Sequence, residues 1–320
     1  MSRTEVREVG GARRRTVVPH TRAWGVGLAF VTSLISGVSI YTNGHAVRRF
    51  PGSAPFTTAK NLVAAVVLGA LLAALTARRS PGGWTPPRTA RTRLGLVAVG
   101  VVGGSVPFLL FFEGLSRATS SDAAFIHKTL VVWVAILAVV VLRERLGWPH
   151  LAAIAALVAG QSLLTDDLAG LGLGSGEVLV FAATLLWSVE VVIAKRLLGH
   201  LSPLTVGVAR MALGALVLVG WLAASGQLGD LADYGAAQWG WVLLTGLLLT
   251  GYVATWYAAL ARAQAVDVTA VLVFGAVVTA ALAGALDGVP LRADLPGLVL
   301  VAAGVVVVSL LPRARPAPAP

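Results

Sequence analysis

The chain has 320 residues, of which 57% are hydrophobic and only 12% charged, and that charged share is about half the usual one for a soluble domain. The mean hydropathy of +0.84 excludes a cytosolic enzyme, a disordered chain and a secreted disulfide scaffold. The net charge is +11, and the sequence contains no cysteine. The basic residues lie mainly between apolar segments, which is a pattern of membrane orientation rather than of nucleic-acid binding. These totals predict a polytopic membrane protein.

Ten segments are apolar enough to cross a bilayer, whose core needs about 20 apolar residues per helix. In chain order they are 23–43, 56–77, 94–115, 121–142, 149–165, 177–196, 203–224, 239–260, 265–286 and 295–312. The fifth and the tenth are the shortest. The apolar run from Ala23 is longer than a signal-peptide core, so we interpret it as a retained first helix. The sequence therefore predicts an all-α membrane protein of about ten transmembrane helices.

The distribution of Lys and Arg predicts the orientation of these helices. With the N-terminus inside, most of the 25 basic residues fall in inner segments, above all in the tail 1–22 and the loop 78–93. The outer loops hold few, and Arg48 and Arg49 are the local exception. Because inner loops carry the excess of Lys and Arg, we expect a multi-pass protein of the plasma membrane with both termini in the cytoplasm.

A weak internal repeat divides the chain into two halves. Leu115-Ser116-Arg117-Ala118 before Asp122 recurs 145 residues later as Leu260-Ala261-Arg262-Ala263 before Asp267. Each half has five spans, an odd number, so the second half is expected to be inverted relative to the first, as in many secondary transporters. Chance likeness between Leu/Ala/Val-rich helices is the alternative explanation.

The expected organisation follows from this repeat. It comprises a basic cytoplasmic tail at 1–22, a first five-helix repeat at 23–167, an outer linker at 168–176, a second five-helix repeat at 177–312 and a cytoplasmic tail at 313–320.

Several motifs resemble one transporter family. The stretch from Gly114-Leu115-Ser116-Arg117-Ala118 to Arg143-Glu144-Arg145-Leu146 resembles the third-to-fourth helix region of the EamA-like branch of the drug/metabolite transporter superfamily. Trp148-Pro149-His150 resembles the family's next element, and Ser175-Gly176-Glu177 resembles the start of its second domain. The resemblance covers about 23–312 and implies a helical bundle that carries small organic molecules, often outward.

This sequence departs from the family at the middle of two helices. Family members often have a proline midway along the fourth and ninth helices. Here Lys128-Thr129-Leu130 and Phe274-Gly275-Ala276 stand in those regions.

Charged residues inside the spans are functional candidates, because a charge in the bilayer is costly. From the helix rise, Lys60 and Lys128 lie roughly 6 and 10 Å into the second and fourth spans from the outside. Glu190 and Arg210 lie roughly 9 and 10 Å from the inner ends of the sixth and seventh spans. Glu113 lies near the outer end of the third span.

Each charged candidate has a functional and a structural interpretation. Glu190 and Arg210 form either a gate or coupling pair, or a static salt bridge between two helices. Lys128 either holds an anionic group of the substrate, such as a carboxylate, or extends its long stem to the outer interface. The same two interpretations apply to Lys60.

The remaining candidates are less polar or lie nearer the surface. His127 either relays a proton or makes a structural hydrogen bond between helices. Glu113 either binds a proton or pairs with Lys128, or lies in headgroup water. Four deep aromatic residues either line a cavity or pack against other helices. They are Trp133, Trp187, Tyr252 and Trp256.

No nucleotide-binding P-loop or zinc-protease motif occurs in the sequence, and we expect no cofactor, no metal and no enzymatic activity. The leading hypothesis is a secondary active transporter that exports a small organic metabolite or drug, with protons as a candidate coupling ion. Its site would lie near mid-membrane, lined by the first, third, fourth, sixth, eighth and ninth spans. Its partners would be a small-molecule substrate and the lipid bilayer, with the oligomeric state open.

Two alternatives remain at this stage. An intramembrane enzyme would use His127 and Glu113 as acid–base residues on a lipid substrate. A structural or sensory membrane protein would have a dry, fully packed centre.

Overall fold

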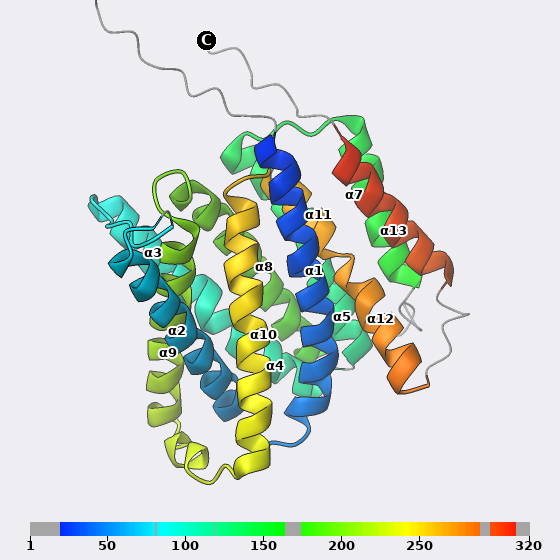
Figure 1. The fold of residues 1–320 in the computed structure, drawn as a ribbon. Helices are drawn as coiled ribbons and strands as arrows, with labels where there is room; N and C mark the ends of the chain where they lie inside the picture. The colour runs from blue at the N-terminus through cyan, green and yellow to red at the C-terminus, as the bar shows by residue number, and fades with distance from the viewer. Residues whose placement is uncertain (1–19, 81, 119, 164–173, 289–294, 312–320) are drawn as a thin grey trace, which may run out of the picture.

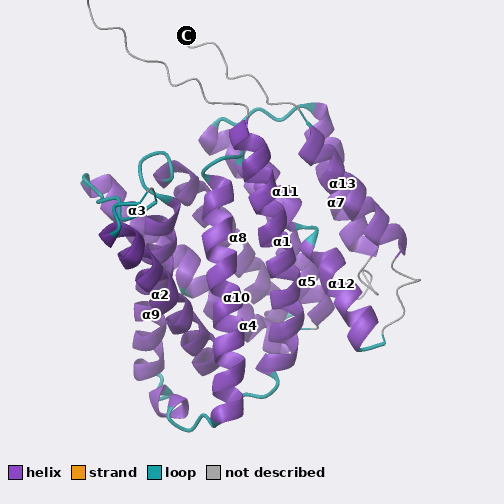
Figure 2. Cartoon of the chain, viewed as in Figure 1, coloured by secondary structure: helices purple, strands orange, loops and turns teal. Residues whose placement is uncertain are grey.

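The computed structural model describes residues 20–80, 82–118, 120–163, 174–288 and 295–311. Every regular element in these ranges is a helix (Figure 2). Most of the expected N-terminal tail, most of the expected linker at 168–176 and the whole tail at 313–320 lie outside the described residues.

The helices follow the predicted spans closely (Figure 1). The first half holds α1 (His20–Val47), α2 (Ser53–Ala77), α3 (Ala90–Gly104), α4 (Val106–Arg117), α5 (Ser120–Lys128), α6 (Leu130–Leu137), the π-helical turn η1 (Ala138–Leu142) and α7 (Trp148–Leu163). The second half holds α8 (Ser175–Leu197), α9 (Pro203–Ala224), the 3-10 turn η2 (Leu228–Leu231), α10 (Ala236–Leu260), α11 (Ala265–Leu272), α12 (Gly275–Leu286) and α13 (Leu295–Leu310).

Eight of the predicted spans are long and apolar enough to cross a membrane. The fifth and tenth correspond to α7 and α13, which have 16 residues each. A helix of that length extends about 24 Å, less than the roughly 30 Å of a bilayer core. The prediction of about ten transmembrane helices is therefore confirmed for eight, and the fifth and tenth, already the shortest in the sequence, form the shorter helices α7 and α13.

Three spans predicted as continuous helices are interrupted. The third breaks at Ser105, whose φ of −137° and ψ of −74° are not helical and whose hydroxyl donates to the Gly100 carbonyl at 3.2 Å. The fourth breaks at Thr129, whose hydroxyl donates to the Ile126 carbonyl at 2.6 Å. Such hydroxyl–backbone bonds compete with the helical ladder. The ninth breaks between Leu272 and Gly275, at Phe274. Thr129 and Phe274 are 145 residues apart, which is the spacing of the sequence repeat.

The two halves begin on opposite sides of the bundle. We call the side where α1 begins and α13 ends the terminal side, and the other side the opposite side (Figure 1). The first helix of the second half, α8, begins on the opposite side beside the end of α4. A Cβ added to Gly176 of α8 would come within 2.7 Å of the Ala118 backbone nitrogen. The first helices of the two halves therefore run in opposite directions.

Glycines allow the two halves to pack closely. At the crossing of α3 and α9, a Cβ on Gly214 would lie 2.7 Å from the Gly104 Cα and would also meet its carbonyl oxygen. Gly160 of α7 approaches the backbone of Gly297 in α13 in the same way. Small residues at such crossings permit the close backbone contact that holds helices together in lipid.

We expect Gly214→Ala to destabilise the protein by about 1–3 kcal/mol, because the new methyl group would meet the backbone of α3, which cannot move aside as a side chain can. The matched control is Gly220→Ala on the same helix, where an added Cβ meets nothing within 4 Å. Thermal unfolding of the purified variants in detergent measures the difference. Equal melting temperatures for the two variants would contradict the close crossing of α3 and α9.

Candidate functional site

A cavity of about 210 Å³ lies between the two halves and is partly open. Its polar lining comes from both halves. Its polar and charged side chains include Asn43, Lys60, His127, Lys128, Glu190 and Arg210. Its aromatic lining is Phe108, Phe111, Phe112, Trp187, Tyr252 and Trp256.

The cavity occupies the half of the bundle toward the opposite side. Gly44 near the end of α1 and Leu115 near the end of α4 line its outermost part. Glu190 and Arg210 line its deepest part, and each is seven residues from the terminal-side end of its helix. The cavity therefore extends from the opposite side to about the depth predicted for these two charges.

All but two of the candidate residues line this cavity. Trp133 does not, because its indole nitrogen donates to the Thr129 hydroxyl at 3.2 Å and its ring packs on Phe181. Glu113 does not either. It is half-exposed and accepts hydrogen bonds from Arg117, one turn further along α4. The ninth span contributes no described residue to the lining, whereas the second and seventh supply Lys60 and Arg210.

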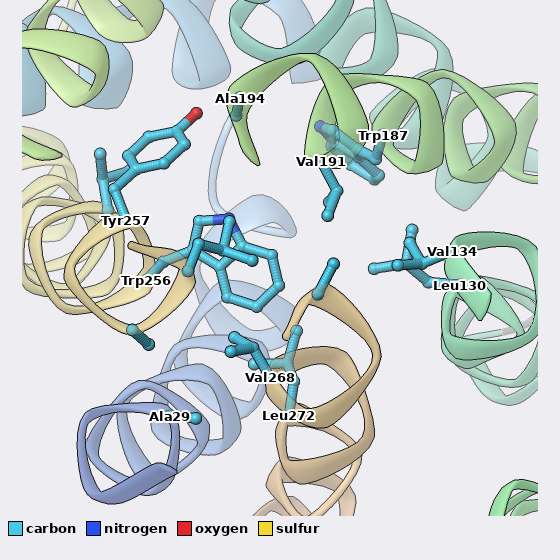
Figure 3. Packing of buried hydrophobic residues seen from close by; sticks show 14 of the residues in the cluster. Ala29, Leu130, Val134, Trp187, Val191, Ala194, Trp256, Tyr257, Val268 and Leu272 are labelled. Carbon is cyan, nitrogen blue, oxygen red and sulfur yellow. The ribbon is translucent and has the colours of Figure 1, made fainter. Parts of the chain in front are cut away.

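Glu190 and Arg210 lie in the deepest part of the cavity wall with Tyr257. The Tyr257 hydroxyl donates to Glu190 Oε1 at 2.5 Å, and both side chains are buried. Figure 3 shows the Tyr257 hydroxyl pointing from α10 toward α8 and Trp256 projecting into the space between the helices. Tyr257 was not among the sequence candidates, although a buried carboxylate requires such a donor.

Arg210 interacts with Glu190 through charge rather than through a direct hydrogen bond. Its guanidinium lies 5.6 Å from the centre of the Phe108 ring. Its Nε and Nη1 have no hydrogen-bond partner among the described residues. The two opposite charges attract one another across the wall of the cavity. The predicted equal depth of the two residues thus corresponds to an electrostatic pair.

The two lysines are buried rather than extended to the surface. Lys60 is 4% exposed, and its Nζ donates to Asn43 Oδ1 at 3.1 Å and lies 4.1 Å from the centre of the Phe112 ring. Lys128 is 8% exposed and has no hydrogen-bond or ion-pair partner among the described residues. Neither lysine therefore extends its ammonium group to the outer interface.

His127 lies against aromatic rings in the cavity wall. Its ring centre is 4.9 Å from that of Trp187 and 5.3 Å from that of Phe111. Its Nδ1 has no hydrogen-bond partner in the described part of the chain. The structure does not bring together His127 and Glu113, the acid–base residues of the alternative enzyme hypothesis, because Glu113 lies outside the cavity lining.

A polar cluster lies at the terminal-side end of the bundle, beyond the deepest part of the cavity. Arg22 at the start of α1 donates from Nε to Asp267 Oδ2 at 3.0 Å, and Asp267 is fully buried. Glu144, which follows η1, accepts hydrogen bonds from the backbone N–H groups of Ala265 at 2.9 Å and Val266 at 3.4 Å. We call Arg22, Glu144 and Asp267 the terminal-side cluster.

The terminal-side cluster joins the two halves around the start of α11. A carboxylate at a helix N-terminus satisfies free N–H groups and matches the positive end of the helix dipole. Burial raises the pKa of the Glu144 carboxyl, and the two N–H donors and Lys195 partly oppose this rise. In the sequence, Glu144 and Asp267 stand out only as parts of motifs, because their contacts join distant parts of the chain.

Comparison with known proteins agrees with this two-half architecture. A family model described as the EamA-like transporter family matches residues 23–165 and again residues 174–310. The chain belongs to the EamA-like transporter family. This family is part of the drug/metabolite transporter superfamily, so the predicted resemblance is confirmed. The family and the apolar helices together identify a multi-pass membrane protein.

A solved structure, described only as "Crystal structure of protein", shares the fold of this family member. It has 18% sequence identity and a TM-score of 0.69, and the match covers 90% of this chain and 97% of that one. At this identity the match shows the fold alone. No curated protein matches the sequence significantly.

We expect Tyr257→Phe to lower stability by about 1–3 kcal/mol, because it removes a hydrogen-bond donor from the buried Glu190 carboxylate. Tyr252→Phe is the matched control. It makes the same change about one and a half turns earlier on α10, where the hydroxyl makes no hydrogen bond with a described residue. Thermal unfolding in detergent compares them. A Tyr257→Phe variant as stable as Tyr252→Phe would show that Glu190 does not depend on this donor.

Proposed function

We propose that this EamA-like protein is a secondary active transporter that exports a small organic solute by alternating access. One observation carries the proposal. The cavity reaches from one side to mid-membrane between the two halves, and contacts between the halves close the other side. Inverted halves that exchange conformations would move such a cavity from one side to the other.

The distribution of basic residues supports placing the terminal side in the cytoplasm. The loop between α2 and α3 carries Arg78, Arg79 and Arg88 on that side. The loop between α9 and α10 on the opposite side carries no Lys or Arg but holds Asp230 and Asp233. With this orientation the cavity faces outward, and the terminal-side cluster is the closure on the cytoplasmic side.

Glu190 is the carboxylate that we assign to coupling. It is the one acidic residue among the described residues that line the cavity. It lies at the deepest level, where it interacts with Arg210 and Tyr257. A proton taken up there would weaken its attraction to Arg210, and this change of charge is available to drive the exchange between conformations.

An intramembrane enzyme is not favoured by this arrangement, because Glu113 and His127 do not share a site. A protein without flux would have a packed centre, whereas this bundle contains a cavity of about 210 Å³ with four charged residues in its wall. Transport therefore accounts for the cavity better than either alternative.

We expect solute-dependent proton movement in proteoliposomes. The protein would be reconstituted around a trapped pH-sensitive dye, and a panel of carboxylates, amines and neutral metabolites would be added one at a time. Glu190→Gln should abolish the pH response because it removes the coupling charge. Glu177→Gln, on the same helix but outside the cavity lining, should retain it. If no solute gives a pH change or flux with the wild-type protein, the transporter proposal fails.

We expect Glu144→Ala to open the cytoplasmic closure more often, because it frees the N-terminus of α11. Since the sequence contains no cysteine, a single Ala263→Cys reports this opening. Ala263 is 4% exposed beside the cluster. A polar maleimide supplied to inside-out vesicles should label Ala263→Cys several-fold faster with Glu144→Ala than without it.

Glu177→Ala, on the opposite side, is the control for this labelling and should leave the rate unchanged. Equal labelling rates in the Glu144→Ala and Glu177→Ala backgrounds would show that Glu144 does not hold the closure.

A further inference from the structure

The cavity wall carries more positive than negative charge. Among the described residues, its basic side chains are Lys60, Lys128 and Arg210, and its one acidic side chain is Glu190. All four are at least 92% buried. Arg210 has Glu190 as its electrostatic partner. Among the described residues of the cavity wall, the two ammonium groups therefore have no compensating carboxylate.

The protein provides only partial compensation for these two cations. Lys60 has the Asn43 amide oxygen and the faces of Phe112 and Phe56, at 4.1 and 5.2 Å from the ring centres. A ring face stabilises a cation but does not neutralise it. Lys128 has no such partner among the described residues. Buried charges in a membrane protein are costly and are retained where they serve a function.

The three cations lie within one cavity rather than at separate surfaces. The Lys60 ammonium lies 5.9 Å and the Arg210 guanidinium 5.6 Å from the centre of the same Phe108 ring. Lys128 follows His127, whose ring is in contact with Phe111 and Trp187 in the same wall. A bound molecule would meet positive charge and aromatic faces at the same time.

From this arrangement we propose that the cavity binds an organic carboxylate with an apolar body. The Lys128 ammonium is the counter-ion of the carboxylate, because it is the cavity cation without a partner among the described residues. Lys60 supplies a second positive charge. The apolar body lies against Phe111, Trp187 and Tyr252. The cavity of about 210 Å³ has the volume of about seven liquid waters at roughly 30 Å³ each, which suits a small acid.

This substrate class rests on the proposed transport function, but the binding site is testable without flux. The probes are 3-phenylpropionate, 3-phenylpropanol and 3-phenylpropylamine, which share one body and differ in the charge of one end. Calorimetric titration of the full-length protein in neutral detergent at pH 7 measures their affinities. We expect the carboxylate to bind at least about tenfold more tightly than the alcohol, and the amine to bind least.

Variants identify the groups that hold the carboxylate. Lys128→Gln should weaken binding of 3-phenylpropionate about tenfold or more and leave binding of the alcohol unchanged. Lys128→Arg should retain most of the affinity because it keeps the charge. Lys60→Gln should weaken it less. Arg48→Gln removes an exposed positive charge on the same side and should change the affinity less than about twofold.

Four results would overturn the carboxylate site. They are absence of 3-phenylpropionate binding by the wild-type protein, equal affinity for the carboxylate and the alcohol, tighter binding of the amine, and an unchanged carboxylate affinity in Lys128→Gln. The first three results are measured on the wild-type protein, so the proposal can be refuted even if a variant fails to fold. Proton-coupled flux of amines or neutral solutes without carboxylate binding would refute this site and leave transport standing. Carboxylate binding without any flux would refute transport and leave this binding site standing.

Discussion

A charge inside a bilayer has no water to stabilise it, so each must be paired or must face a polar cavity. This bundle uses both solutions, at two different depths. On the terminal side, Asp267 is paired with Arg22, and Glu144 accepts two backbone N–H groups. Near mid-membrane and beyond, Lys60, Lys128, Glu190 and Arg210 face one cavity. On the terminal side, the charged groups are therefore paired or hydrogen-bonded. In the cavity wall, Lys60 and Lys128 have no carboxylate partner among the described residues.

The interrupted helices also meet this constraint on polar groups in the bilayer. Irregular backbone at membrane depth is tolerated where it is buried in protein or lines a cavity. The break at Thr129 directly follows Lys128 in the cavity wall. The start of α11 supplies the free N–H groups that Glu144 binds. The fourth and ninth spans break 145 residues apart although neither carries the proline that the family often has there. The break is therefore a property of the repeat and does not depend on one residue type.

The sequence could predict the features that depend on composition and on the spacing of its motifs. The spans, the odd-numbered repeat, the family and the matched depth of Glu190 and Arg210 follow from apolar length and from motif spacing. Contacts across the bundle could not be derived in this way. Arg22 and Asp267 are 245 residues apart, and the partner of Glu190, Tyr257, lies on another helix. Depth in the span made Trp133 a cavity candidate, but depth does not tell which way a side chain points. In the structure its indole nitrogen donates to the Thr129 hydroxyl and its ring packs on Phe181.

The contacts of α1 join it to both helices of the interrupted ninth span. At its start, Arg22 holds Asp267 of α11. At its middle, a Cβ on Gly37 would come within 2.6 Å of the Gly275 carbonyl oxygen in α12. Near its end, the Tyr41 hydroxyl donates to Asp287 at 2.8 Å, just after α12. These contacts join α1 to the α11–α12 pair along its length. α1 also packs on α10, where the Thr32 hydroxyl donates to the Thr255 hydroxyl at 2.8 Å. The bond between Glu144 and the start of α11 joins these helices to the segment that follows η1. In the proposed transport cycle, opening toward the terminal side would break both the bond between Glu144 and the start of α11 and the Arg22–Asp267 pair, because both belong to the terminal-side cluster.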